Sequence, residues 1–198
     1  LNREWISDKN NSLTFSILLT ENITPQNINI INLAASVAIA QSIENLYQLD
    51  VRLKWPNDVL IATRKVCGIL VESTSIGDKI DRLVVGIGVN VNQPIFEGKF
   101  LVPATSIRKE FGKVTSRERL LAEILNEFEK IFKKANKKPN EILDTWRSKC
   151  KMIGEKVKIV NGDKETYGIF EDIDENGFLL LNESDGVKRV HSGDVSLR

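Results

Sequence analysis

The sequence predicts an α+β fold: a mixed or antiparallel sheet with helices, followed by a small C-terminal β-barrel domain. Between residues 51 and 91, strand-like segments are joined by short connections, which favours antiparallel neighbours over crossovers. After residue 151, short β-like segments follow one another, divided by Gly, Asn and Asp, which is typical of small barrels. We therefore expect one domain over residues 1–150 and a second over residues 151–198.

A strand and a long helix are predicted first. Residues 13–19 have a strand pattern. Thr24 and Pro25 indicate a helix start, because a capping hydroxyl precedes a proline suited to the first helical position. Apolar residues at near-helical spacing then predict a helix to about Tyr47. These residues are Ile28, Ile31, Ala35, Ile39, Ile43 and Leu46.

Strands are predicted next, with turn signals between them. Pro56, Asn57 and Asp58 separate the first two, and Gly77 precedes the last. The predicted strands cover residues 51–55, 59–62, 66–73 and 82–91.

The second half of the chain predicts a loop, two helices and the C-terminal strands. Residues 93–114 are expected to form a loop that contains "PATSI". Thr115 and Glu118 have the spacing of a capping box, and an apolar stripe follows. Another helix is predicted over Glu141 to Lys149. The expected C-terminal strands are "KVKIV", "TYGIFEDI", "GFLLLN", "VKRVHS" and "VSLR".

Composition narrows the classes of partner. With 28 basic and 27 acidic side chains, the net charge of +1 disfavours binding of a polyanion by charge, so no nucleic acid is expected as a partner. No apolar run reaches the roughly 20 residues of a membrane span, so no membrane partner is expected. Cys67 and Cys150 are too few for a disulfide scaffold. We expect free thiols and a cytoplasmic location.

Several common catalytic motifs are absent. "GIGVNVN" lacks the third glycine of a dinucleotide fingerprint and ends a strand without opening a helix. "FGKVTS" has Val114 where a P-loop needs Ser or Thr. His191 is the single histidine, so we expect a structural or surface role for it and no metal site.

The stretch "VRLKWPNDVL" places a lysine at the end of a strand, opposite its apolar face. A solvated Lys54 is the ordinary interpretation of such a position. Pro56 makes the following turn rigid, and Asn57 and Asp58 are expected to shape the loop by bonding neighbouring amides. A lysine held in this way is suited to meet an anion.

Glycines in the neighbouring predicted strands support the same interpretation. Gly68, Gly86 and Gly88 lack side chains, so a flat ligand could lie close to the backbone there. Bulges or twist are the alternative explanation for glycines in strands.

"KWPNDVL", "KVCGILVES" and "VVGIGVNVN", in this order, resemble the biotin protein ligases, also called biotin–[acetyl-CoA-carboxylase] ligases. The segments "LNREW", "PATSI" and "SGDVSLR" fit the same family, so the resemblance covers essentially the whole chain. Within this family, the chain most resembles the short ligases, which lack an amino-terminal DNA-binding domain.

The resemblance implies an activity and its substrates. The family condenses biotin with ATP to biotinyl-5′-AMP and pyrophosphate, then transfers biotin to a lysine of a carboxyl-carrier domain. Lys54 would be catalytic, contacting the biotin carboxylate and the adenylate phosphate. A fixed ammonium would lower the repulsion between these two anions and stabilise the charge that develops as they react. Mg²⁺ would arrive with ATP, whose phosphates supply most of its ligands.

The resemblance also assigns further binding residues. Arg3 would face the ATP phosphates, and Trp5 would either cover the adenine or pack in the core. Gly68 and Gly88 would lie under the ligand, and Asn90 would hydrogen-bond within the site.

The family's biotin-binding strands and Gly-Arg-Gly-Arg loop would precede Leu1, so we expect the chain alone to ligate biotin poorly. The alternatives are a lipoate or octanoate ligase, and a non-catalytic biotin ligase fragment that only binds. The carrier domain is expected to pair with a sheet edge, and a homodimer could use a similar edge.

Overall fold

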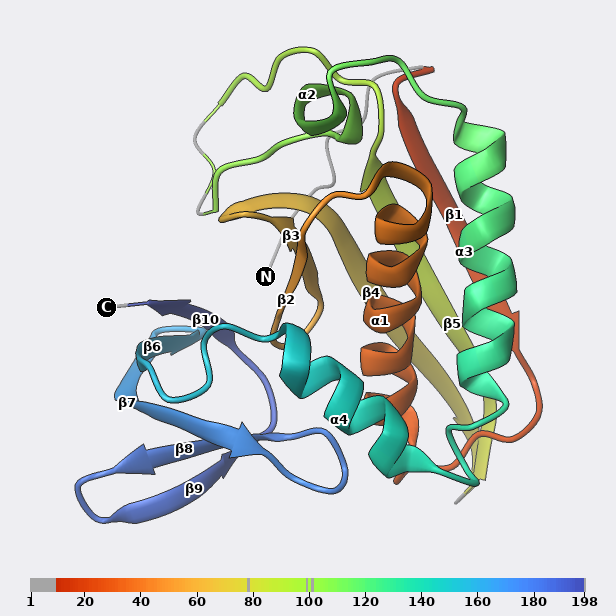
Figure 1. The fold of residues 1–198 in the computed structure, drawn as a ribbon. Helices are drawn as coiled ribbons and strands as arrows, with labels where there is room; N and C mark the ends of the chain where they lie inside the picture. The colour runs from red at the N-terminus through yellow and green to blue at the C-terminus, as the bar shows by residue number, and fades with distance from the viewer. Residues whose placement is uncertain (1–9, 78, 99, 101, 198) are drawn as a thin grey trace.

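The computed structural model describes residues 10–77, 79–98, 100 and 102–197. Within these residues, the first sheet has the strand order β1-β5-β4-β3-β2, and every neighbouring pair is antiparallel (Figure 1). The strands are β1 (Ser12–Leu19), β2 (Val51–Lys54), β3 (Asp58–Ile61), β4 (Arg64–Ile76) and β5 (Lys79–Asn90). The predicted α+β class and antiparallel pairing are confirmed.

Helices cover one face of this sheet (Figure 1). α1 contacts β2, β3 and β4, and α3 and α4 pack against α1. The long helices are α1 (Ile28–Tyr47), α3 (Arg117–Phe132) and α4 (Pro139–Lys149). Because α1 is enclosed by the sheet and two helices, its small residues Ala34, Ala38 and Ala40 have no exposed surface.

The two faces of the first sheet differ because strand side chains alternate in direction. The face toward α1 is apolar and includes Val51, Leu53 and Val59, each at most 1 % exposed. The opposite face carries Lys54 and its paired residue Asp58, together with Gly68 and Gly88. This second face holds the candidate site.

The C-terminal sheet is antiparallel, with the order β10-β6-β7-β8-β9. A small C-terminal β unit is confirmed, but the predicted barrel is not closed: in the described chain, β9 and β10 are the opposite edges of an open sheet. Closure would require these two strands to pair with each other. The strands are β6 (Lys156–Asn161), β7 (Lys164–Ile173), β8 (Leu179–Glu183), β9 (Gly186–Val190) and β10 (Asp194–Leu197).

A short helix lies where a loop was predicted. α2 (Ile107–Phe111) begins after Ser106, whose Oγ accepts a hydrogen bond from the backbone N–H of Lys109. It ends at Gly112, which has a left-handed φ of 81°. These are the side-chain cap and C-terminal glycine of a regular helix.

The predicted helix starts are corrected by one to three residues. Residues 24–27 form a turn in which Thr24 donates its N–H to Asn27 Oδ1, so α1 begins only at Ile28. For α3 the capping residue is Ser116, whose Oγ accepts from the N–H of Arg119. The N–H of Thr115 is instead bonded to Asn92 Oδ1.

No described helix is long and apolar enough to cross a membrane.

Candidate functional site

One row of paired residues crosses the first sheet from edge to edge. Thr14 lies opposite Gly88, Gly88 opposite Gly68, Gly68 opposite Asp58, and Asp58 opposite Lys54. Residues that pair directly across strands project to the same face. The row therefore forms a strip with no side chains at its two glycines and an ion pair at one end.

Lys54 is buried within this row. The residue is 7 % exposed, and its Nζ lies 3.3 Å from Asp58 Oδ2. The interpretation of a solvated surface lysine is therefore wrong. An ammonium group this far from water is costly unless a carboxylate or another anion lies beside it.

Asp58 is bound to two lysines. Its second oxygen, Oδ1, lies 2.5 Å from Nζ of Lys65, and the carboxylate-bearing side chain is 10 % exposed. Asp58 is thus the first residue of β3 and the shared anion of two ammonium groups, directly after the turn that the sequence predicted it to shape. The cluster of Lys54, Asp58 and Lys65 has a net positive charge, which suits an incoming anion.

Sequence reasoning did not include Lys65 in the site. It was assigned to the turn between two predicted strands, but β4 already begins at Arg64. Its position three residues before Gly68 would place it on the opposite face of a regular strand, so the sequence alone carried no signal for it.

The turn between Lys54 and Asp58 is held from both sides. Asn57 donates its side-chain amide to the carbonyl of Ile69 at 2.6 Å, and its own carbonyl accepts from the N–H of Ile69 at 3.1 Å. Asn32 of α1 donates to the carbonyl of Pro56 at 2.9 Å, and the Trp55–Pro56 peptide bond is cis. The turn is therefore fixed to both β4 and α1.

Asn90 lies two residues beyond Gly88 in β5, opposite Ser12. Its Oδ1 accepts from Gln93 Nε2 at 3.2 Å, and the same nitrogen donates to Ser12 Oγ. Asn90 is 5 % exposed. The remaining predicted site residues, Arg3 and Trp5, lie outside the described residues.

The other candidate groups lie elsewhere. His191 is exposed, and its ring packs on Phe178 with centroids 4.6 Å apart. Cys67 and Cys150 are unpaired and buried. Burial raises the pKa of the Cys67 thiol, and it raises the pKa of Cys150 to about 11. Both thiols are therefore weak nucleophiles at neutral pH.

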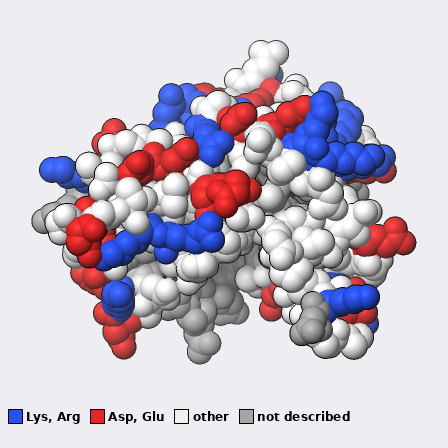
Figure 2. Space-filling view, turned by 90° about the horizontal axis from the view of Figure 1, so that it is seen from below, with Lys and Arg blue, Asp and Glu red and all other residues white. Residues whose placement is uncertain are grey.

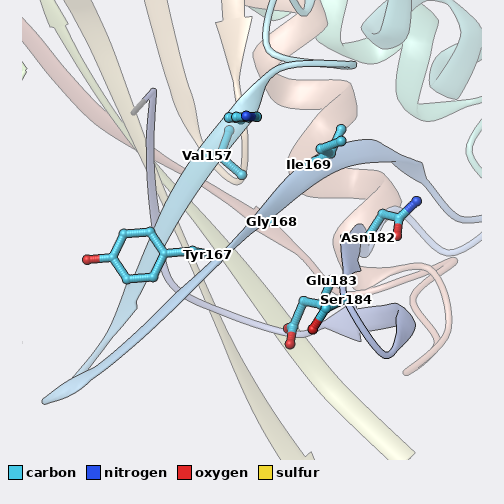
Figure 3. A pocket seen from close by; sticks show the side chains of 8 residues that line it. Val157, Tyr167, Gly168, Ile169, Asn182, Glu183 and Ser184 are labelled. Carbon is cyan, nitrogen blue, oxygen red and sulfur yellow. The ribbon is translucent and has the colours of Figure 1, made fainter.

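An open hollow of about 210 Å³ lies on the C-terminal sheet, away from this row (Figure 3). It is lined mainly by β6, β7 and β8, including Val157, Tyr167 and Asn182. Figure 2 shows basic and acidic side chains interspersed over one face of the molecule rather than gathered by sign. Neither feature provides the buried charges that distinguish the Lys54 row.

The chain matches two family models. Residues 2–90 match "Biotin/lipoate A/B protein ligase family", and residues 152–198 match "Biotin protein ligase C terminal domain". Among the curated relatives, the bifunctional ligase/repressor BirA of Bacillus subtilis is 32 % identical over 100 % of this chain and 62 % of its own length. The biotin–[acetyl-CoA-carboxylase] ligase of Paracoccus denitrificans is 32 % identical over 72 % of this chain and 61 % of its own length. The chain thus spans less than two thirds of these relatives.

Solved structures agree with these matches. The biotin protein ligase of Aquifex aeolicus superimposes with a TM-score of 0.83 at 31 % identity, covering 95 % of this chain and 82 % of that one. The same enzyme in complex with biotin and ATP gives a TM-score of 0.84 over 99 % of this chain and 82 % of that one.

Proposed function

This chain belongs to the biotin protein ligase family, and we propose that it carries the activity of an ATP-dependent biotin–[acetyl-CoA-carboxylase] ligase. In the first step, the biotin carboxylate attacks the α-phosphorus of ATP, forming biotinyl-5′-AMP and releasing pyrophosphate. In the second, a lysine amine of a biotin carboxyl carrier domain attacks the acyl carbon and releases AMP. Mg²⁺ enters as part of the ATP substrate.

The observation that carries this proposal is the burial of Lys54 at the end of a glycine strip. Its ammonium is 3.3 Å from Asp58, and the same row continues through Gly68 and Gly88. A flat ligand lying on the glycines would bring its anionic end to the ammonium. In a site with little water, a fixed ammonium stabilises charge that develops on carboxylate and phosphate oxygens.

We assign the remaining predicted residues around this centre. Gly68 and Gly88 lie under the ligand, and Asn90 closes the strip with Gln93. Arg3 contacts the ATP phosphates, and Trp5 covers the adenine, as the family resemblance implies.

Biotin is preferred over lipoate or octanoate as the acid. The family model of residues 2–90 includes lipoate ligases, but the relatives in Aquifex aeolicus and Paracoccus denitrificans are biotin ligases. Competition between biotin and lipoate for adenylation tests this choice. A protein that only binds would take up a non-reactive biotinyl-AMP analogue without releasing pyrophosphate from ATP.

The test of the proposal is the Lys54→Ala variant, made in the protein that contains this chain. We expect single-turnover formation of biotinyl-AMP to fall on the order of 10²–10³-fold, as for the loss of one charge-stabilising contact. The fold should be retained, because Asp58 keeps Lys65 as a partner at 2.5 Å. Lys133→Ala, which changes a side chain that is 69 % exposed, is the control. Adenylation at the unchanged rate in Lys54→Ala would contradict the role of this lysine.

Membership of the family also suggests domain boundaries, partners and a location for the protein. We propose that residues 1–150 form the catalytic domain and residues 151–198 the C-terminal domain, with the family-model match beginning at residue 152 in support. We propose a carrier domain that docks on a sheet edge, and a homodimer as a further use of such an edge. The unpaired buried thiols of Cys67 and Cys150 fit a cytoplasmic location.

A further inference from the structure

A β-bulge lies in β4 between the glycine strip and Lys65. Val59 pairs with Cys67, but the next residue, Leu60, pairs with Lys65, so Val66 is an extra residue in β4. Both Val66 and Cys67 have no exposed surface. One extra residue in a strand reverses the side-chain alternation beyond it.

The bulge decides the direction of Lys65. Residues three positions apart in a regular strand project to opposite faces, so Lys65 would point away from the face of Gly68. With Val66 inserted, Lys65 lies on the same face, and its Nζ reaches Asp58 Oδ1 at 2.5 Å. Bulges that aim a side chain in this way are frequent beside functional sites.

The segment "PATSI" fixes the backbone of Lys65 from its other side. The N–H of Lys65 donates to the carbonyl of Pro103 at 2.8 Å, and the N–H of Thr105 donates to the carbonyl of Lys65 at 2.9 Å. Lys65 thereby forms a parallel bridge with Ala104. Two independent features, the bulge and this bridge, hold one lysine against Asp58.

We propose that Lys65 is a positioning residue of the site: it holds the Asp58 carboxylate so that Lys54 can turn to the anionic substrate. This inference rests on the proposed biotin ligation. The Asp58 carboxylate is closer to Lys65, at 2.5 Å, than to Lys54, at 3.3 Å. When Lys54 contacts the substrate, Lys65 keeps the poorly exposed carboxylate paired, and no buried charge is left without a partner.

Removal of the Lys65 charge should slow adenylation. In Lys65→Met, Asp58 has Lys54 as its remaining partner in the cluster, so Lys54 is retained by Asp58. Adenylation should then fall about 10–100-fold in kcat, which corresponds to roughly 1.4–2.8 kcal/mol of transition-state stabilisation. The KM for biotin should rise as well. Lys65→Arg should restore most of the rate, because the guanidinium keeps the charge.

A double variant separates this role from a structural one. Asp58→Asn removes the anion that retains Lys54, so Lys65→Met/Asp58→Asn should adenylate faster than Lys65→Met alone. If Lys65 only stabilised the fold, the second substitution would slow the reaction further. The control is Lys133→Met, which should match the unmodified protein. If Lys65→Met does not fold, Lys65→Gln is compared with Lys65→Gln/Asp58→Asn in the same way.

The measurements are pyrophosphate release with biotin and ATP, the dissociation constant of a non-reactive biotinyl-AMP analogue, and thermal unfolding. Unmodified protein that neither adenylates biotin nor binds the analogue would refute the proposed function itself. Active unmodified protein with Lys65→Met kinetics equal to its own would refute the role of Lys65. The same conclusion follows if the double variant is no faster than Lys65→Met.

Discussion

The indole Nε1 of Trp55 donates a hydrogen bond of 3.0 Å to the carbonyl oxygen of Gly177, 122 residues later in the chain. Trp55 follows the buried Lys54 directly, and Gly177 lies in the turn before β8. Asp174 Oδ1 holds this turn by accepting from the N–H groups of Asn176 and Phe178. The C-terminal sheet is therefore bonded to the residue beside the site lysine.

Trp55→Phe should destabilise the protein. The substitution removes a donor that is 2 % exposed and leaves the Gly177 carbonyl without this partner. We expect a loss of about 2–3 kcal/mol in the free energy of unfolding, from the lost hydrogen bond and the smaller ring. Urea denaturation measures it. Tyr167→Phe, at an exposed hydroxyl bonded to Glu165, should change stability by less than about 0.5 kcal/mol. Equal midpoints for Trp55→Phe and the unmodified protein would count against the importance of this contact.

Gly177→Ala should be more damaging than Gly162→Ala. Both glycines have positive φ, +80° and +61°, so a Cβ costs about 1–2 kcal/mol of backbone strain at either position. At Gly177 the new Cβ would also lie 2.9 Å from Leu33 Cδ1, whereas nothing lies within 4 Å at Gly162. We expect Gly177→Ala to lose a further 1–3 kcal/mol, roughly, from overpacking. Matched melting temperatures for the two variants would show that α1 yields to the methyl group.

Gly88→Val should block the ligand. Gly88 pairs with Gly68 on the face of Lys54, so a side chain there would fill the strip. Because Gly88 is buried, the valine also overpacks its surroundings, and we expect a loss of roughly 1–3 kcal/mol in the free energy of unfolding. The affinity for a non-reactive biotinyl-AMP analogue should fall about 10–100-fold, the cost of overpacking by a few methyl groups.

The control for Gly88→Val is Thr74→Val, at an exposed position of β4 that pairs with Arg82, outside the row. It should retain the analogue affinity. Calorimetry compares the two variants. Unimpaired binding by Gly88→Val would place the ligand elsewhere.

Stability should fall as the pH rises above about 9, in part through the two thiols. The pKa of Cys150 is raised by burial to about 11, and that of Cys67 is raised as well. As the pH rises, the thiols of the unfolded chain therefore lose their protons before those of the folded protein. The stability that each thiol contributes to the folded state is complete below the pKa of that thiol in the unfolded chain. That stability is lost between about pH 9 and 11 for Cys150, with a slope of up to ~1.4 kcal/mol per pH unit.

Urea denaturation from pH 8 to 11 measures this loss. A Cys67→Ala/Cys150→Ala variant provides the comparison, since its free energy of unfolding should decline less steeply over the same range. Identical slopes in the two proteins would show that the thiols do not contribute.

The sequence predicted the elements well because their signals are local. Alternation placed Val51 and Leu53 on a buried face, and the structure confirms it. Helical spacing from Ile28 onward predicted α1, although its exact start depended on the turn bond between Thr24 and Asn27. The short α2 was missed, because its cap at Ser106 and its end at Gly112 enclose too few residues to show helical periodicity.

Some features depend on residues far apart in the chain, and only the tertiary structure decided them. The row from Thr14 to Lys54 joins five strands, and the open C-terminal sheet depends on where β10 pairs. The single extra residue at Val66 turned Lys65 toward Asp58.

By itself, then, the sequence determined the strands, the long helices and the family, and it predicted a role for Lys54, since each depends on neighbouring residues or an ordered set of motifs. The tertiary structure decided the partners of that lysine. Strand register is set by pairing across the whole sheet, and a shift of one residue moves a side chain to the other face.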